Sequence, residues 1–380
     1  MKIAFVTSHI TRSTQWNWFS EELNKRNIPH IHIIINDIKP ILYDDLKNLN
    51  VPVYYLKHRN KLSFIINFFR VIKILKAHKI DLVHTELPYG NFIGQLAAYA
   101  AQIKMRVTTC ENTIWFADFN SKKQEIIDRI TYFFAKKVIA LTNESYEFII
   151  KHFNMTPKKL HIIHHSIKAS DYLEITDKQV EDLRMELNIQ KNEFVIGMVA
   201  RFEFWKGHIY AVEAMRKLVT EFPHVHLYIF GSKGECYDEI MDKISEYKLE
   251  KNITYKGFVA NSTTIFKIFD IHLHIPVKLQ SETFGINIIE GMISGCTQVL
   301  TISGISSFTA RDGKNCIVVP YKSSEAVYST LRKLILDDAL RKRLGNQARE
   351  DAFKHFNYIE KVDLHLKLYE ALKNEITNES

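Results

Sequence analysis

The feature that most constrains this chain is an alternation of strand-like and helix-like segments that runs through its first half and then restarts. In the first half, strands are expected at 2–7, 30–35, 53–56, 82–84, 106–109, 138–141 and 160–163, and helices at 14–26, 61–78, 89–103, 121–136 and 144–153. A new series begins with a strand at 193–200. Such alternation predicts an α/β fold with parallel sheets covered by helices. A chain of 380 residues can form two such domains, each with its own core.

The loops that follow the strands are the first candidates for a functional site, because open parallel sheets bind ligands beyond the carboxyl ends of their strands. In the first half these loops begin at Ser8, Thr85 and Cys110. In the second half, Arg201 and Lys206 follow the strand at 193–200, just before a helix. Two cations beside a helix start suit a phosphate or diphosphate.

The stretch 280–291 carries two carboxylates, Glu282 and Glu290, eight positions apart. The residues between them predict a tight loop that enters an apolar helix, which we expect to begin near Thr283. Free amides at a helix start form an anion site, and Gly285 lets a ligand approach the backbone. Since eight residues make a little over two turns, we expect Glu290 roughly on the face of Glu282. The alternative is a pair of surface acids, although Glu290 lies in an apolar run where an unpaired charge is costly.

The net charge of +8 is unevenly distributed, with +11 on residues 1–170 and −3 on residues 171–380. A basic half can meet nucleic acid, an anionic membrane surface or an anionic substrate. The sequence has no zinc-finger spacing, RNA-recognition signature or basic heptad repeat, so we predict no nucleic-acid partner. The helix at 61–78 combines basic residues with an aliphatic and aromatic face, as interfacial membrane helices do. The alternative is an ordinary sheet-covering helix with a solvated basic edge.

Other features favour a cytoplasmic protein without a metal site. No apolar run reaches 18 residues, so no spanning helix is expected, and residues 1–7 predict a first strand rather than a signal peptide. The four scattered cysteines are typical of reduced thiols. Pairs such as His272 and His274 share one strand face, but no further ligand at metal spacing accompanies them.

The motifs of the second half, in this order, resemble the retaining glycosyltransferase family 4. They are Val199-Ala200-Arg201 with Lys206-Gly207, Ile229-Phe230-Gly231, Gly257-Phe258-Val259, and Glu282-Thr283-Phe284-Gly285-Ile286 through Glu290. The resemblance implies the GT-B architecture, in which two Rossmann-like parallel-sheet domains face a central cleft. It implies an acceptor-binding domain at 1–170, a linker at 171–190, a nucleotide-sugar-binding domain at 191–356, and a helix at 357–380 that crosses back to the first domain.

The same resemblance assigns roles to individual residues. Arg201 and Lys206 would bind the donor diphosphate, Glu282 the transferred sugar and Glu290 the ribose hydroxyls. The remaining donor contacts would come from Gly231, Phe258, Val259, Phe284, Gly285 and Ile286. The first half departs from the family, since no glycine pair follows its first strand. Where many members have a histidine, this chain has Cys110-Glu111-Asn112, and Glu111 is the candidate replacement near the anomeric carbon.

The resemblance implies a metal-independent retaining hexosyltransferase that uses a nucleotide-diphosphate sugar as donor. The acceptor would be a glycan or lipid-linked molecule in cell-surface polysaccharide synthesis, and contact with the anionic inner face of the membrane is left open. One alternative is another GT-B enzyme, either a nucleotide-sugar epimerase or a glycogen-synthase-like transferase. The other is a protein that binds a sugar nucleotide without catalysis.

Overall fold

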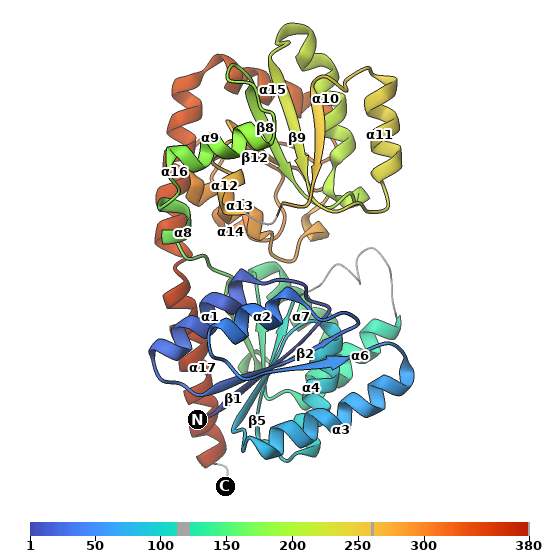
Figure 1. The fold of residues 1–380 in the computed structure, drawn as a ribbon, viewed down its shortest axis with the longest axis vertical. Helices are drawn as coiled ribbons and strands as arrows, with labels where there is room; N and C mark the ends of the chain where they lie inside the picture. Colours follow the sequence, from blue (N-terminus) through green and yellow to red (C-terminus); the bar gives the residue numbers. More distant parts are fainter. Residues whose placement is uncertain (112–121, 260–261, 379–380) are drawn as a thin grey trace. The chain divides into compact units, whose positions relative to one another are not determined.

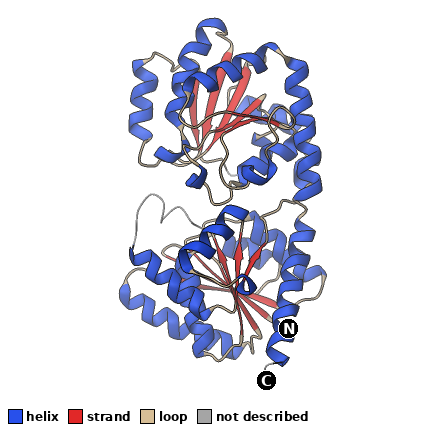
Figure 2. Cartoon of the chain, turned by 180° about the vertical axis from the view of Figure 1, so that it is seen from behind, coloured by secondary structure: helices blue, strands red, loops and turns tan. Residues whose placement is uncertain are grey.

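The computed structural model describes residues 1–111, 122–259 and 262–378. The chain forms two compact units, one comprising Met1–Ser166 with Tyr358–Ser380 and the other comprising Ile167–Asn357. In each unit a sheet of parallel strands is covered by helices on both faces (Figure 1, Figure 2). This confirms the α/β class with two Rossmann-like parallel-sheet domains that the sequence predicts.

The first unit contains a seven-stranded sheet in the order β3-β2-β1-β4-β5-β6-β7. Its strands are β1 (Ile3–Ser8), β2 (His30–Asn36), β3 (Val53–Lys57), β4 (Leu82–Thr85), β5 (Met105–Cys110), β6 (Lys137–Ala140) and β7 (Leu160–Ile162). Its described helices are α1 (Thr14–Lys25), α2 (Ile41–Asn48), α3 (Lys61–Ala77), α4 (Pro88–Ala100), α6 (Lys122–Phe134), α7 (Asn143–Phe153) and α17 (Tyr358–Asn378). The strands and long helices match the sequence expectation, whereas α2 was not predicted.

Strand β1 shows how this sheet builds a core on each face. Its side chains alternate between the two faces, so Ile3 and Phe5 pack with α1 and α2, while Ala4 and Val6 pack with α3 and α4. The C-terminal helix α17 contributes Tyr369 to the first of these cores. Helix α17 is therefore an integral part of the first unit.

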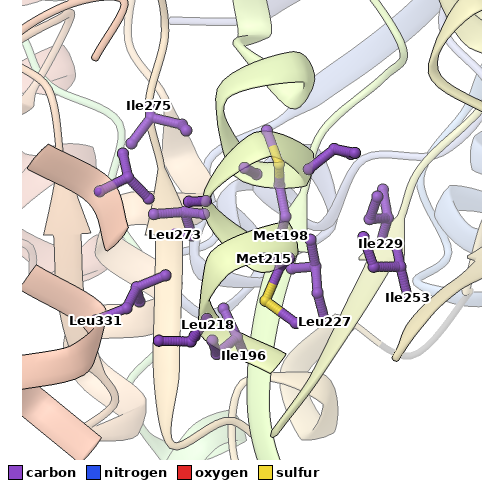
Figure 3. Close-up of a cluster of buried hydrophobic side chains, with 14 of the residues drawn as sticks. Ile196, Met198, Met215, Leu218, Leu227, Ile229, Ile253, Leu273, Ile275 and Leu331 are labelled. Carbon is purple, nitrogen blue, oxygen red and sulfur yellow. The ribbon is translucent and has the colours of Figure 1, made fainter. Parts of the chain in front are cut away.

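The second unit contains a six-stranded sheet in the order β10-β9-β8-β11-β12-β13. Its strands are β8 (Phe194–Val199), β9 (Val225–Phe230), β10 (Ile253–Gly257), β11 (Ile271–His274), β12 (Thr297–Leu300) and β13 (Cys316–Val318). Its described helices are α8 (Ser170–Leu173), α9 (Asp177–Glu186), α10 (His208–Glu221), α11 (Tyr237–Glu246), α12 (Ser262–Ile265), α13 (Ile286–Ser294), α14 (Ser306–Thr309), α15 (Ser324–Leu336) and α16 (Asp338–His355). Figure 3 shows part of its main core, where Met215 and Leu218 of α10 pack among the strand residues Ile196 and Leu227.

Residues 171–190, the expected linker, include most of α8 and all of α9 and belong to the second unit. Leu183 and Leu187 pack in a buried cluster with Tyr228 of β9. The segment is thus anchored to the second unit by apolar residues, although most of its residues are polar.

In both sheets the strand order reverses next to the first strand. The reversal falls between β1 and β4 in the first unit and between β8 and β11 in the second. The crevice beyond the carboxyl ends of two such strands is where open α/β sheets bind ligands. The reversal therefore places Arg201 to Lys206, after β8, in the same region as the segment after β11.

Two further findings concern chemistry outside the sheets. All four cysteines are buried free thiols. Within the described residues, no helix is both long enough and apolar enough to cross a membrane.

Candidate active site

An ion pair between Lys206 and Glu282 lies where β8 and β11 end. Lys206 closes the short 3₁₀ helix η2 (Phe204–Lys206), and Glu282 directly follows η3 (Leu279–Ser281). His274, the last residue of β11, has its Nε2 atom 3.5 Å from Glu282 Oε1. Burial and the nearby charge of Lys206 lower the pKa of His274 to about 3, so its ring is neutral at neutral pH. Lys206 therefore supplies the positive charge that balances Glu282.

Backbone contacts hold Lys206 against the loop after β11. Gly207, with φ of +80°, turns the chain from η2 into α10, and a Cβ atom there would lie 2.1 Å from the carbonyl oxygen of Ile275. The amide of Val277 donates to the carbonyl oxygen of Trp205 at 2.9 Å. Since the close approach leaves no space for a side chain, glycine is required directly after Lys206.

The loop after β12 fixes the backbone around Glu282. The Glu282 amide donates to Ser303 Oγ at 2.9 Å, and Ser303 Oγ donates to the carbonyl oxygen of Leu279 at 2.8 Å. The Ile305 amide donates to the carbonyl oxygen of Phe284 at 2.7 Å. Phe284 itself is buried, at 5% exposure. The carboxylate of Glu282 is thus presented by a segment anchored at both ends.

The helix in this stretch begins at Ile286, so the predicted start near Thr283 is wrong. Gly285, at φ of +83° and ψ of +61°, is its N-cap, and this left-handed conformation ends any helical path from Glu282. Asn287, in the first turn, donates from Nδ2 to the carbonyl oxygen of Val199 at 2.7 Å and so ties the helix to β8. Because Glu282 precedes the helix, the prediction that it shares a helix face with Glu290 is also wrong. The helix start remains next to the end of β8, with no side-chain hydrogen bond capping it.

Glu290 accepts a hydrogen bond from the Tyr172 hydroxyl at 2.9 Å. Tyr172 lies in α8 and is 1% exposed; burial and the Glu290 charge raise its pKa well above its usual range. Sequence reasoning missed Tyr172, which falls in the segment interpreted as a linker. Its one signal was a large aromatic residue in an otherwise polar stretch.

Arg201 is exposed, and its guanidinium lies 3.5 Å from Glu203 Oε1. Beside it, Gly231 follows β9 with φ of +144°, and a Cβ atom there would lie 2.2 Å from the carbonyl oxygen of Ala200.

The Gly231 amide donates to the carbonyl oxygen of Gly257 at 2.9 Å, which brings the segment after β10 to the same edge. In that segment, Phe258 is 76% exposed and Val259 packs on the Leu183 cluster. The predicted donor-binding segments therefore meet at one edge of the second sheet.

In the first unit, Glu111 follows β5 and pairs with His165, whose Nε2 lies 3.2 Å from Glu111 Oε2. Burial raises the pKa of Glu111, but His165 and Lys361 lower it by more than burial raises it. The net pKa of Glu111 therefore lies below its usual value. Asn112, its predicted neighbour in the loop, lies outside the described residues.

Ser8 is buried, and its Oγ accepts the Gly90 amide at 2.8 Å, so it stabilises the start of α4.

Two of the histidines at strand spacing, His272 and His32, have side-chain hydrogen-bond partners. His272 Nδ1 lies 2.7 Å from Gln298 Oε1, and His32 Nε2 lies 2.9 Å from Ser20 Oγ. In the described part of the chain, no three His, Cys, Asp or Glu side chains are grouped so that they could hold a metal ion.

The two parallel-sheet units have the fold of GT-B glycosyltransferases, and comparison with known proteins identifies the family. The family model "Glycosyltransferase Family 4" matches residues 19–171, and the model "Glycosyl transferases group 1" matches residues 179–351. The chain belongs to the group 1 glycosyltransferases of the family 4 type, and it is a glycosyltransferase.

Two relatives and one solved structure illustrate the similarity. An N-acetylgalactosaminyltransferase of Campylobacter jejuni, named for an N-acetylgalactosamine-N,N'-diacetylbacillosaminyl-diphospho-undecaprenol acceptor, is 24% identical over 83% of this chain and 80% of its own length. An Escherichia coli α-1,3-galactosyltransferase, named for UDP-Gal and GlcNAc-diphosphoundecaprenol, is 24% identical over 78% of this chain and 77% of its own. The structure of HepE from Anabaena with UDP-glucose has a TM-score of 0.84 at 19% identity, covering 98% of this chain and 100% of that one.

Proposed function

We propose that this protein transfers a sugar, with retention of anomeric configuration, from a nucleotide-diphosphate sugar to a glycan or lipid-linked acceptor in cell-surface polysaccharide or glycolipid synthesis. The observation that carries the proposal is the Lys206–Glu282 pair at the strand reversal of the second sheet, with Arg201 on the same edge. The names of the two bacterial relatives support a diphospho-lipid acceptor, and the UDP-glucose in HepE supports a nucleotide-sugar donor.

In the proposed reaction, the bond between the anomeric carbon and the donor diphosphate breaks while the acceptor oxygen bonds to that carbon on the same face, and the proton of the acceptor hydroxyl passes to the departing diphosphate. Negative charge grows on the departing diphosphate. Arg201, Lys206 and the first amides of α13 would stabilise this charge, which is the role that a metal ion has in other enzymes. Glu282, released from Lys206, would accept hydrogen bonds from the sugar, and Glu290 would accept them from the ribose. We therefore propose that no metal is required.

A turnover assay separates this function from its alternatives. The protein is incubated with UDP-, GDP- or ADP-sugars, with or without a bacterial lipid extract and with excess EDTA. A transferase releases nucleoside diphosphate only when the extract is present, and EDTA leaves the rate unchanged. An epimerase yields an isomerised sugar nucleotide without an acceptor, and a binding protein gives a thermal shift without release. A product whose NMR coupling shows the inverted anomer would refute retention.

We further propose that the first unit contacts an anionic membrane through α3. Leu62, Ile65, Ile66 and Phe69 are exposed on this helix at a spacing that puts them on one side, while Val71 and Leu75 pack on the sheet. Exposed Arg70 and Lys73 complement an anionic lipid surface.

Vesicle sedimentation tests the membrane contact. We expect the protein to sediment with vesicles containing phosphatidylglycerol and not with pure phosphatidylcholine. The double variant Leu62→Ser, Phe69→Ser should remain in the supernatant, whereas Leu336→Ser, which alters an exposed leucine of the second unit, should behave as wild type. Equal sedimentation of all three proteins would exclude α3 as the contact.

A further inference from the structure

A chain of hydrogen bonds connects four buried or half-buried side chains at the carboxyl edge of the first sheet. Glu111 Oε2, after β5, lies 3.2 Å from His165 Nε2, in the segment after β7. His165 Nδ1 lies 3.1 Å from Lys361 Nζ of α17, and Lys361 Nζ donates to Gln15 Oε1 of α1 at 3.0 Å. The residues come from distant parts of the sequence but from a single compact unit.

The donors and acceptors in this series of hydrogen bonds determine which atoms carry its protons. A lysine ammonium has donors only, so His165 Nδ1, which faces it, accepts. The ring proton is then on Nε2 and is donated to Glu111. At the other end, Gln15 Nε2 donates to the carbonyl oxygen of Ser166 at 2.5 Å, so its amide oxygen is turned toward Lys361. Each group is thereby held in one orientation.

The charges in this region also favour an ionised Glu111. Glu86, after β4, lines a cavity of about 10 Å³ together with Gln15 and Lys361, room for about one water molecule. Burial and the Glu111 charge raise the pKa of Glu86, whereas the pKa of Glu111 is lowered by its basic neighbours against the effect of burial. A neutral Glu86 leaves Lys361 as the cation that balances Glu111, and a buried charge needs such a partner.

The second carboxylate oxygen of Glu111, Oε1, is the end of this series of hydrogen bonds at which a ligand can bind. Oε1 is buried and accepts no hydrogen bond from any residue that the structure describes. A buried acceptor without a donor is costly, and it marks a position where a ligand donor can be received. Glu111 also stands at the strand edge where α/β sheets bind ligands.

We propose that His165 and Lys361 are positioning residues that hold the Glu111 carboxylate and direct its Oε1 toward a hydroxyl of a sugar substrate. This inference rests on the proposed transferase function and gives α17 a role in it. Lys361 acts only through Glu111, so its removal should matter only when Glu111 is present.

A double-mutant cycle tests this dependence. Lys361→Met should lower kcat by at least about 10-fold, because a positioned acid–base group contributes about 100-fold or more. Its donor Kd should stay within about twofold, because the proposed donor-binding residues lie in the second unit. In a Glu111→Gln background, Lys361→Met should add less than about a twofold loss. Lys361→Arg should recover part of the activity, and Lys367→Met, an exposed lysine of the same helix, should behave as wild type. Equal losses in both backgrounds would overturn the inference.

A titration provides a readout without turnover and guards against a misfolded variant. The ¹³C carboxyl signal of Glu111, assigned by its absence in Glu111→Gln, is followed against pH in the wild type, Lys361→Met and Lys361→Arg. Loss of the cation should raise the pKa of Glu111 in Lys361→Met, moving the acid limb of kcat to higher pH, and Lys361→Arg should restore it. Identical titrations overturn the inference. A shifted titration in a protein that turns over no sugar nucleotide would instead refute the proposed function.

Discussion

Lys206 and Glu282 form an ion pair in which both side chains are largely buried, with 15% and 9% of their surfaces exposed. The two residues come from separate strand-end loops of one sheet. Removing either one leaves the other as a buried charge without its partner, which is more costly than losing an exposed pair. In the proposed reaction, a donor that binds here would exchange this contact for its own, because the diphosphate would attract Lys206 and the sugar hydroxyls would donate to Glu282.

Replacing either member of this pair by alanine should nearly abolish turnover. We expect Lys206→Ala and Glu282→Ala each to lower kcat by about 100- to 1000-fold, the usual effect of losing one group that stabilises the transition state. Lys217→Ala, in α10, removes an exposed ion pair with Glu325 of α15; it is the control and should leave kcat unchanged. Steady-state release of nucleoside diphosphate measures the effect. Activity within a few-fold of wild type in either site variant would show that the assignment is wrong.

Tyr172→Phe should weaken both the fold and donor binding. The variant removes the hydroxyl that donates to Glu290, and a hydrogen bond to a charged group contributes about 1.5–3 kcal/mol. We expect a lower Tm and a donor Kd raised about 3- to 10-fold, since Glu290 loses its anchor. Tyr328→Phe removes an exposed tyrosine–glutamate hydrogen bond, to Glu221, and should change neither quantity. An unchanged donor Kd in Tyr172→Phe would show that Glu290 does not take part in donor binding.

Gly231→Ala should destabilise the second unit far more than Gly313→Ala. Both glycines have positive φ, but a Cβ atom at Gly231 would lie 2.2 Å from the carbonyl oxygen of Ala200, and one at Gly313 would have no atom within 4 Å. Backbone strain alone costs about 1–2 kcal/mol, which is the expected loss for Gly313→Ala. Urea unfolding gives both values. Equal losses would mean that β8 and β9 can separate at Gly231 without cost.

Asp128→Asn should stabilise the protein at alkaline pH and not at acid pH. Burial raises the pKa of Asp128 in α6 to about 7, despite the hydrogen bond from Gln124 Nε2 at 2.9 Å. In the unfolded chain the group ionises near pH 4 (about 3.9), so folding becomes less favourable by up to about 1.4 kcal/mol per pH unit between about 4 and 7. Above pH 7 the penalty is complete, and below pH 4 it is absent. We therefore expect the Tm gain of the variant to be large at pH 8 and near zero at pH 4. A gain that does not vary with pH would contradict the raised pKa.

Local sequence patterns were sufficient for the strands and for the edge that carries the site. Strands β1 and β8 are short apolar runs bounded by polar residues, and Arg201 and Lys206 follow β8 directly. In parallel sheets the position of a loop after a strand fixes the edge on which it lies, so the edge of the candidate site could be predicted without tertiary contacts. The predicted start of α13 was wrong. The true start depends on Gly285 and on the carbonyl oxygen of Phe284, which accepts a hydrogen bond from the distant Ile305.

What the sequence alone determined is therefore the α/β class, the family, and the set of polar residues at the strand ends. The tertiary structure decided the partners: Lys206 for Glu282, Tyr172 for Glu290, and Lys361 with His165 for Glu111. Periodicity reports on neighbours within a few residues, whereas these partners are brought together by packing of elements distant along the chain. A buried charge takes the donor that the fold places beside it, and only the folded chain specifies which donor that is.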